Sequence, residues 1–435
     1  FKYFLYLLLL SMLPSLNMKA SERKSLFDRN WYFYRGDVRN AESPVYNDSA
    51  WRKVDLPHDW SVEPLSFQKQ GITTGPFSRM SEGDIDTGQT VGGEGWYRKE
   101  LTLAGSDADK RIVLYFEGVY NQSELWINGK KANYNVYGYT SYRVDITPYL
   151  NAPGTPNVIA MKVVNAGRNS RWYAGSGIFR HVWLIKTNKL YLDKWDTFVN
   201  ASELQKKEAV IKFSTIVHNE GLQNQSGKIG IKIYSPAGNE VFSTSQDVML
   251  SEGTPVATSF SLKKPELWSI DTPVLYTAEV SLSSDGKEYD KISVPFGIRT
   301  LSFSAEKGFL LKGKSVKLKG GCVHHDNGLL GAAAIDRAEE RKVELMKANG
   351  YNAVRCAHNQ VSEHFLDACD RLGMLVIHET FDQWQKAKRE QDYHQFFDEW
   401  SDWDLAASVR RDRNHPSIIM WSTRWSNVLM NLRET

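Results

Sequence analysis

NAVRCAHNQVSEHFLDACDRLGMLVIHETF, residues 352–381, decides the fold of the C-terminal third of this 435-residue chain. Residues 352–358 form a short apolar run typical of a buried strand, and 374–381 form another. Between them, 362–373 reads as a helix that ends at Gly373, a common helix stop. A strand, a helix and a second strand in this order predict a parallel sheet with a crossover helix.

The same alternation continues on both sides of this stretch. We expect further strands at 316–325 and 417–422, a helix at 333–350, and helical structure from the second strand to about Asp412. These make four strands, whereas a complete (β/α)8 barrel has eight strands and takes roughly 250 residues. The sequence therefore predicts the first half of a TIM barrel over 302–435.

The residues that precede this barrel show short alternating runs separated by Gly, Asn and Pro, without a long helical segment. In 25–187 one run is RIVLYFEGV (111–119), and Asn128-Gly129 is a hairpin turn signal. This pattern predicts a β-sandwich. Strand patterns continue over 188–300, where their number and length suit a smaller, immunoglobulin-like sandwich. The expected fold class is multidomain, β plus α/β.

Composition limits the kinds of partner and cofactor. Hydrophobic residues make up 41% and charged residues 24%, as in ordinary globular domains. The net charge of +3, with no run of like charge, argues against nucleic acid as a partner. The three cysteines, Cys322, Cys356 and Cys369, are too few for a disulfide framework and fit no zinc spacing. The sequence therefore predicts no metal site and no cofactor.

The first twenty residues predict an export signal. Lys2 is followed by an apolar run, residues 4–13, and then by the small residue Ala20. A membrane span needs roughly 20 apolar residues, so this run predicts no stable span. We expect residues 1–20 to be a signal peptide and the protein to be secreted or periplasmic; a buried strand is the alternative.

Polar side chains gather at the ends of the first three predicted barrel strands, where barrel active sites lie. A single polar residue there is more often a cap, but three neighbouring strand ends that all carry such residues favour a binding site. His, Asn and carboxylate groups suit a ligand rich in hydroxyls, and an indole offers a flat face to a sugar ring. The candidates are His324, His325, Arg355, His358, Asn359, Glu379, Asp382 and Trp384.

Longer motifs occur in a fixed order along the three predicted parts. They include RWYAGSGIFRHVWL (171–184), LWSIDTPVLY (267–276), KLKGGCVHHDNGLLGAA (317–333) and DRNHPSIIMWS (412–422). Together they resemble glycoside hydrolase family 2, in particular its bacterial β-galactosidase-like members. The resemblance implies a sugar-binding jelly roll over 25–187, an immunoglobulin-like domain, and a catalytic barrel that hydrolyses β-glycosides with retention.

The resemblance also implies roles for particular residues. Positions that border the sugar pocket in the family are His324, His325, Arg355, His358 and Asn359. Two positions at which the jelly roll contributes to the edge of this pocket are Arg171 and Trp172.

The chain departs from the family pattern after Ser422. The family continues into Asn-Glu, whose Glu is the general acid/base, and the spacing places this pair at Trp425 and Ser426. The nucleophile Glu of a later strand has no counterpart. A serine hydroxyl is far too weak an acid to replace a carboxyl group near neutral pH. The chain is therefore expected to be a truncated form without catalytic residues.

Three interpretations stay open at this point. The first is an enzyme by family, a retaining hydrolase of β-galactosides or related glycans in carbohydrate catabolism. The second is a non-catalytic carbohydrate-binding remnant, and the third is a remnant without activity. The sequence leaves open the sugar, the linkage and the oligomeric state, homo-oligomers included. A cation is compatible with the family, although no residue cluster demands one.

Overall fold

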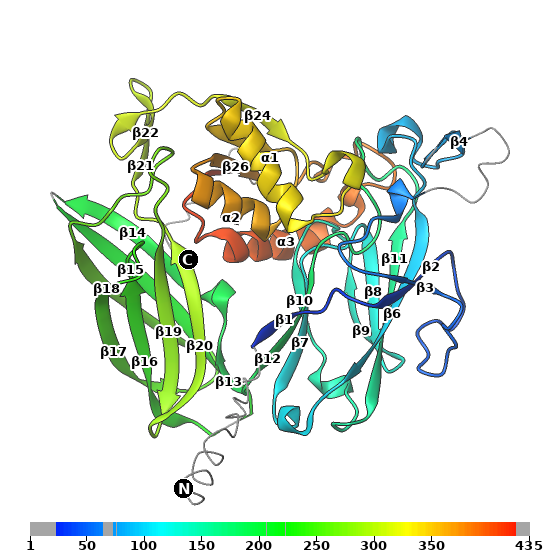
Figure 1. Cartoon of the computed structure of the whole chain (residues 1–435), viewed down its shortest axis with the longest axis horizontal. Coiled ribbons are helices and arrows are strands. Elements are labelled where there is room, and N and C mark those ends of the chain that lie inside the picture. Colours follow the sequence, from blue (N-terminus) through cyan, green and yellow to red (C-terminus); the bar gives the residue numbers. More distant parts are fainter. Residues whose placement is uncertain (1–22, 64–72, 75, 206, 222, 423–435) are drawn as a thin grey trace, which may run out of the picture.

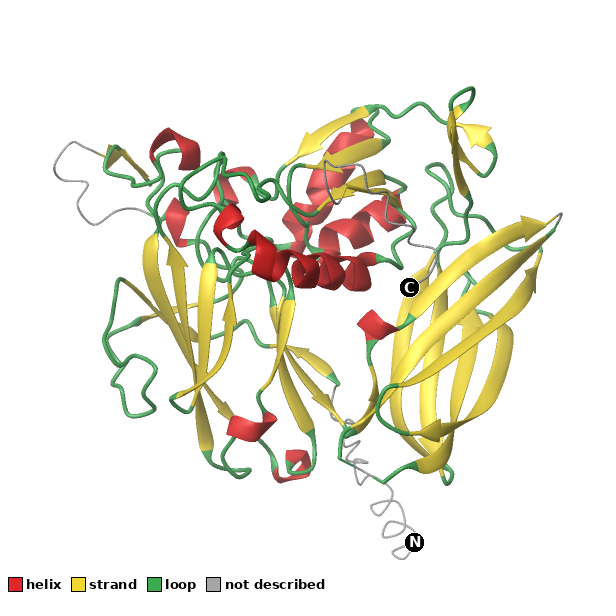
Figure 2. Ribbon diagram, turned by 180° about the vertical axis from the view of Figure 1, so that it is seen from behind, coloured by secondary structure: helices red, strands yellow, loops and turns green. Residues whose placement is uncertain are grey.

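The chain folds into three parts in the computed structural model (Figure 1). Two β-sandwiches stand side by side, and the C-terminal α/β part lies across one end of them in both views (Figures 1 and 2). The predicted signal peptide and Ser426 lie outside the described residues. The structure describes residues 23–63, 73–74, 76–205, 207–221 and 223–422.

The first sandwich consists of two antiparallel sheets that face each other. Alternate residues of each strand enter the core between the sheets, as Ser123, Leu125 and Ile127 do in β8 (Gln122–Ile127). The predicted sandwich is thereby confirmed. The four-stranded sheet has the order β1 (Lys24–Leu26), β12 (Val182–Thr187), β7 (Arg111–Phe116), β10 (Tyr142–Asp145), and the six-stranded sheet has the order β3 (Arg52–Val54), β2 (Trp31–Arg35), β6 (Gly93–Thr102), β11 (Pro156–Asn165), β8, β9 (Lys130–Asn135).

The turn between β8 and β9 confirms the predicted hairpin. Ile127 pairs with Lys130, and the two turn residues between them have positive φ angles, 52° at Asn128 and 77° at Gly129. Both central residues of a type I′ turn need positive φ, which explains the Asn-Gly sequence.

The second sandwich has the immunoglobulin-like size that the sequence predicted. Its strand β19 (Tyr276–Ser284) alternates buried and half-buried residues along its whole length, so Ala278, Val280 and Leu282 enter the core. One sheet contains β13 (Leu190–Leu192), β15 (Glu208–Asn219), β14 (Phe198–Gln205) and β18 (Thr254–Lys263), and the other has the order β17 (Glu240–Leu250), β16 (Gln225–Tyr234), β19, β20 (Lys287–Phe296).

The C-terminal part is a four-stranded parallel sheet with crossover helices, as predicted. Helix α2 (Glu363–Leu372) begins where the Ser362 side chain accepts the Phe365 N–H at 3.1 Å, and it ends at Gly373 with φ 72°. The sheet order is β24 (Gly320–Val323), β25 (Ala353–Cys356), β26 (Leu375–Glu379), β27 (Ile418–Ser422), and the other helices are α1 (Asp336–Ala348) and α3 (Phe397–Asp412).

Two smaller antiparallel sheets complete the described strands. One precedes the parallel sheet and the other projects from the first sandwich beside the grey trace in Figure 1. They consist of β21 (Leu301–Ser304), β22 (Gly308–Leu311) and β23 (Lys314–Ser315), and of β4 (Thr73–Thr74) and β5 (Phe77–Ser78).

The expected helix between β26 and Asp412 is wrong over its first half, because residues 380–396 form a loop with one short 3-10 turn. The buried carboxylate of Asp392 explains the loop. It accepts backbone N–H groups from Lys388 at 2.8 Å, Arg389 at 2.6 Å and His394 at 3.0 Å, which a continuous helix would use internally.

This loop packs against the first sandwich and fixes the two parts to each other. Tyr137 of the sandwich contacts Tyr393 of the loop, with ring centroids 4.4 Å apart, and donates to the Thr380 carbonyl at 2.7 Å. Arg411 of α3 donates to the Ser141 hydroxyl at 2.7 Å. The sandwich therefore lies directly beside the strand ends of the half-barrel.

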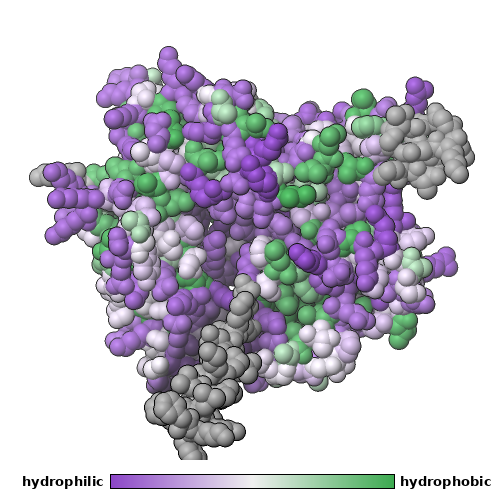
Figure 3. Space-filling model, in the orientation of Figure 1, coloured by the Kyte–Doolittle hydropathy of each residue, from purple (hydrophilic) through white to green (hydrophobic). Residues whose placement is uncertain are grey.

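On the face shown in Figure 3, hydrophobic residues form separate groups among hydrophilic ones. Among the described residues, no helix is long and apolar enough to cross a membrane.

Candidate functional site

A cavity of about 460 Å³ lies at the C-terminal ends of β25 and β26. Its walls come from these two strand ends, from the loop after β26, from Ser422 of β27 and from the first sandwich. The structure therefore brings together side chains from four separate segments. Six of the residues predicted for the site line it: Arg171, Arg355, His358, Glu379, Asp382 and Trp384.

Glu379 is held by two neighbours from β25 and its following turn. Arg355 Nε donates to Oε1 at 2.6 Å, and Nδ1 of His358 lies 2.8 Å from Oε2. Burial alone would raise the pKa of Glu379, but the hydrogen bonds from His358 and Arg355 outweigh it and hold this pKa below the usual value. Glu379 is therefore an ionised carboxylate with both oxygens engaged.

Asp382 is held in the same way from two other segments. Arg171 donates from Nε to Oδ2 at 2.9 Å and from Nη2 to Oδ1 at 2.5 Å, and Lys388 Nζ donates to Oδ1 at 2.8 Å. Burial acts to raise the pKa of Asp382, yet the two cations lower it below the usual value. The side chain of Asp382 is only 3% exposed.

Two further predicted site residues, Trp172 and His324, pack beside His358 but do not line the cavity. The Trp172 ring lies 5.0 Å from the His324 ring and 5.7 Å from the His358 ring, measured between centroids. Burial lowers the pKa of His324, so its imidazole is neutral at physiological pH. Of these three residues, His358 lines the cavity, and the other two pack against its ring.

His325 and Asn359 are placed elsewhere. Nε2 of His325 lies 2.9 Å from the Ala174 carbonyl, and its ring packs between Tyr139 and Phe179 of the first sandwich. Burial lowers the pKa of His325 to about 3. Asn359 is 1% exposed, and its Nδ2 has no hydrogen-bond partner among the described residues.

Sequence reasoning missed five residues of the wall, namely Phe381, Lys386, Ala387, Lys388 and Ser422. The two lysines belong to the run QKAKRE (385–390), a cluster of basic residues directly after a predicted strand end. The run was expected to be helical, and a helix would have directed the two lysine side chains away from the strand end. The lysines were therefore not predicted as site residues.

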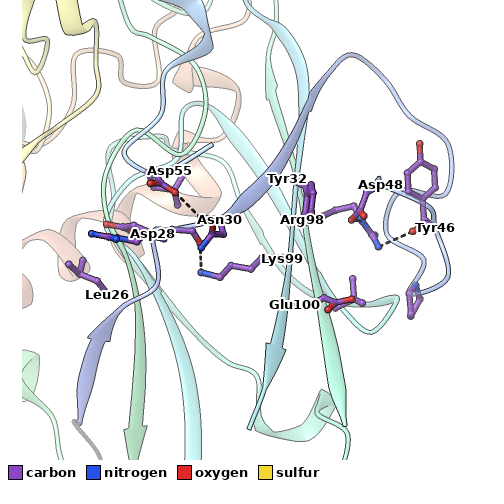
Figure 4. Close-up of a pocket in the computed structure, with 14 residues that line it drawn as sticks. Leu26, Asp28, Asn30, Tyr32, Tyr46, Asp48, Asp55, Arg98, Lys99 and Glu100 are labelled. Atoms are coloured by element: carbon purple, nitrogen blue, oxygen red, sulfur yellow. Dashed lines mark hydrogen bonds and ion pairs between the residues drawn. The ribbon is translucent and has the colours of Figure 1, made fainter. Parts of the chain in front are cut away.

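A larger cavity, of about 770 Å³, lies on the first sandwich (Figure 4). Several of its charged groups are already committed to fold contacts. Arg98 pairs with Asp48 at 2.8 Å, and Lys99 donates to the carbonyls of Phe27 at 2.7 Å and Arg29 at 2.8 Å. These contacts fix loops to strand β6, so size alone does not make this cavity the functional site.

One group within the described residues has the composition of a metal site. Ligand atoms of Asp367, Asp370 and His415 lie within 4.8 Å of one another. Burial would lower the pKa of His415, but Asp370, 2.6 Å away, dominates and raises it to about 9. The imidazole would have to release this proton before it could bind a metal, and Asp370 also accepts the Ser417 N–H at 3.0 Å. The cluster fits an ion pair that fixes the start of β27.

Comparisons with known families match nearly the whole described chain. Residues 27–188 match the sugar binding domain of glycosyl hydrolases family 2, residues 191–299 match the glycosyl hydrolases family 2 model, and residues 304–427 match its TIM barrel domain.

Individual relatives agree with these matches. A β-galactosidase of Bacteroides ovatus is 40% identical over 94% of this chain and 47% of its own length. A β-glucuronidase of Formosa agariphila is 27% identical over 92% of this chain and 42% of its own length. A crystal structure of a glycosyl hydrolase family 2 member from Bacteroides cellulosilyticus has a TM-score of 0.88 and 44% identity, covering 92% of this chain and 51% of that one. The chain thus spans about half the length of these relatives.

The order of the three domains, the half-barrel with polar groups at its strand ends, and these matches agree with one another. The chain belongs to glycosyl hydrolase family 2.

Proposed function

We propose that the cavity at the ends of β25 and β26 binds the terminal sugar of a β-glycoside. The observation that carries this proposal is the convergence of Arg355, His358 and Glu379 with Arg171 of the other domain in one cavity. Side chains of this kind bind hydroxyl groups directionally, and Trp384 adds an aromatic surface. A pocket of this size and mixed lining suits a small ligand.

We further propose that the full-length protein hydrolyses β-galactosides with retention, as part of carbohydrate catabolism. The name of the Bacteroides ovatus relative supports galactosides, and family membership supports hydrolysis. The residues of this cavity would then hold the sugar while two carboxyl groups perform the bond cleavage.

We propose that this 435-residue chain binds β-glycosides without cleaving them. A retaining mechanism needs a protonated carboxyl group and a nucleophilic carboxylate about 5 Å apart. Glu379 and Asp382 are the carboxyl groups that line the cavity among the described residues, and each is held ionised by cations that occupy its oxygens. Ser426, at the expected acid/base position, cannot donate a proton near neutral pH. A non-catalytic carbohydrate-binding role is therefore the second candidate function.

Export is part of the same proposal. The basic start, short apolar run and Ala20 of residues 1–20 support a secreted or periplasmic protein. Mass spectrometry of the exported protein is expected to find an N-terminus near Ser21, and an exported protein that retains residues 1–20 would contradict this proposal.

Saturation-transfer NMR with methyl β-D-galactopyranoside tests the binding proposal. The chain is expected to transfer saturation to the sugar, and His358→Ala is expected to reduce this transfer strongly. His364→Ala is the control, because His364 lies on α2 beside Asp336, at 3.4 Å, outside the cavity. Equal transfer for wild type and His358→Ala would exclude this cavity.

A further inference from the structure

Asp59 is a buried carboxylate of the first sandwich, in the loop after β3, and its hydrogen bonds reach three separate segments. The residue is 3% exposed. Its Oδ1 accepts the N–H groups of Ser61 at 2.9 Å and Ser176 at 2.8 Å. Its Oδ2 accepts the Ala332 N–H at 2.8 Å and the hydroxyl of Tyr173. Only the bond from Ser61 belongs to the short 3-10 helix that Asp59 caps, so the other three serve contacts beyond this helix.

Two of the bonded segments also carry residues in or beside the glycan cavity. Tyr173 follows Arg171, which lines the cavity, and Trp172, which packs beside it. Ala332 lies in the loop after β24, which begins with His324. The rings of Trp172 and His324 are in contact, with centroids 5.0 Å apart. One carboxylate therefore ties the segment that carries Arg171 to the loop of the half-barrel.

Two glycines pack directly against this carboxylate. Gly175 has a φ of 75° and Gly331 a φ of 61°, in the left-handed region that favours glycine. A Cβ at Gly175 would lie 2.8 Å from Oδ2 of Asp59, and a Cβ at Gly331 would lie 2.5 Å from the same atom. Neither position has room for a side chain. The two segments therefore approach Asp59 as closely as a backbone can, and small displacements of the carboxylate must move them.

A second carboxylate of the first sandwich shows what a purely structural role looks like. Asp107 is also 3% exposed. It accepts the Lys186 ammonium at 2.5 Å and the Ala104 N–H at 3.3 Å, and both partners belong to the first sandwich. Asp107 thus fixes one domain internally, whereas Asp59 connects this domain with the half-barrel beside the cavity.

We propose that Asp59 is a positioning residue of the glycan site. Through Tyr173 and Ala332 it holds the segment 171–176 against the loop after β24, and it thereby sets the place of Arg171 in the cavity. Asp59 itself does not line the cavity. This inference rests on the proposed glycan-binding function, and it adds a residue that determines affinity from outside the cavity.

Saturation-transfer NMR titration of the whole chain with methyl β-D-galactopyranoside tests it through a double-mutant cycle. Arg171→Ala is expected to weaken binding roughly tenfold, because the sugar loses a charged donor. Asp59→Asn keeps the size of the side chain but replaces one acceptor oxygen by an amide, and it is expected to weaken binding roughly fivefold. In the Asp59→Asn protein, adding Arg171→Ala is expected to weaken binding by only about threefold or less, because Arg171 is already displaced.

Tyr173→Phe is the milder second variant, since it removes one donor and leaves the three backbone bonds of Asp59 in place. It is expected to weaken binding roughly threefold and to show the same coupling to Arg171→Ala. Asp107→Asn is the matched control. It is expected to lower the midpoint of urea denaturation, to leave the affinity for the sugar unchanged, and to show no coupling to Arg171→Ala.

The coupling separates positioning from a general loss of stability, which would not depend on Arg171. Unchanged affinity in folded Asp59→Asn and Tyr173→Phe proteins would overturn the inference while the glycan-binding proposal stands. The same holds for losses of affinity that simply multiply with that of Arg171→Ala. Absence of sugar binding by wild type would contradict both.

Discussion

Arg171 of the jelly roll and Asp382 of the half-barrel form a bidentate ion pair, although 211 residues separate them in the sequence. The planar guanidinium matches the two carboxylate oxygens, with distances of 2.9 and 2.5 Å. Because Asp382 also anchors Lys388, this pair sets the position of the loop that forms the cavity wall. The cavity is therefore formed by the two domains together.

The ion pair makes a prediction about stability. Arg171→Ala alone is expected to lower the free energy of unfolding by about 1 kcal/mol, because Lys388 still pairs with Asp382 and Arg171 is partly exposed to solvent. Arg171→Ala combined with Lys388→Ala is expected to cost about 3 kcal/mol, because a buried carboxylate then has no cation.

Urea denaturation of the single and double variants measures this difference. Arg168→Ala is the control, because Arg168 is 49% exposed and its pair with Asp84 spans 3.5 Å, so a change below about 0.5 kcal/mol is expected. If the free-energy losses of the two single variants add up to the loss of the double variant, neither cation compensates for the absence of the other at Asp382.

Asp404 predicts a pH dependence of stability. Burial raises the pKa of Asp404 to about 7, although hydrogen bonds from Thr140 and Tyr393 act to lower it. The folded state therefore binds this proton more tightly than the unfolded state does. Its contribution to stability is full below about pH 4 and is lost as pH rises to about 7.

Asp404→Asn is expected to remove this slope, which amounts to on the order of 2–4 kcal/mol between pH 4 and 7. Thermal or urea unfolding at several pH values measures it. Asp402→Asn, an exposed position on the same helix, should leave the slope as it is in wild type. A slope that survives in Asp404→Asn would assign the pH dependence to another group.

The two histidines His325 and His358 are predicted to have separable roles. His325→Phe is expected to lower the free energy of unfolding by about 1–2 kcal/mol, because the Ala174 carbonyl loses its partner, and to leave sugar binding unchanged. His358→Ala is expected to weaken sugar binding and to leave the free energy of unfolding unchanged. Loss of sugar binding in a folded His325→Phe protein would return His325 to the site.

An activity assay checks the prediction about catalysis. The chain is expected to release no product from an aryl β-galactoside above the background reaction, because Glu379 and Asp382, the carboxyl groups that line the cavity among the described residues, are held ionised and neither can donate a proton. Turnover that disappears in Glu379→Gln would show that Glu379 acts in catalysis in spite of its ion pair.

Local sequence patterns were enough to predict the half-barrel and much of the site. Two strand patterns, 352–358 and 374–381, flank a helix that ends at Gly373. They place Arg355, His358 and Glu379 at neighbouring strand ends, because parallel strands end at one edge of the sheet. Register within a sheet then brings their side chains together.

Contacts between distant segments could not be predicted in this way. His324 and His325 are adjacent, and only the packing of the jelly roll decides that His325 turns to Ala174 while His324 stays beside Trp172. The loop around Asp392 was expected to be helical, because the carboxylate contacts that hold it open leave no periodic signal.

A crystal structure of the chain with methyl β-D-galactopyranoside at saturating concentration tests the central claim most directly. We predict electron density for one pyranose ring in the cavity formed by Arg355, His358 and Trp384, with hydroxyls in hydrogen-bond contact with the first two. Density in the larger cavity beside Tyr32 and Arg98, or an empty first cavity at that concentration, would contradict the account.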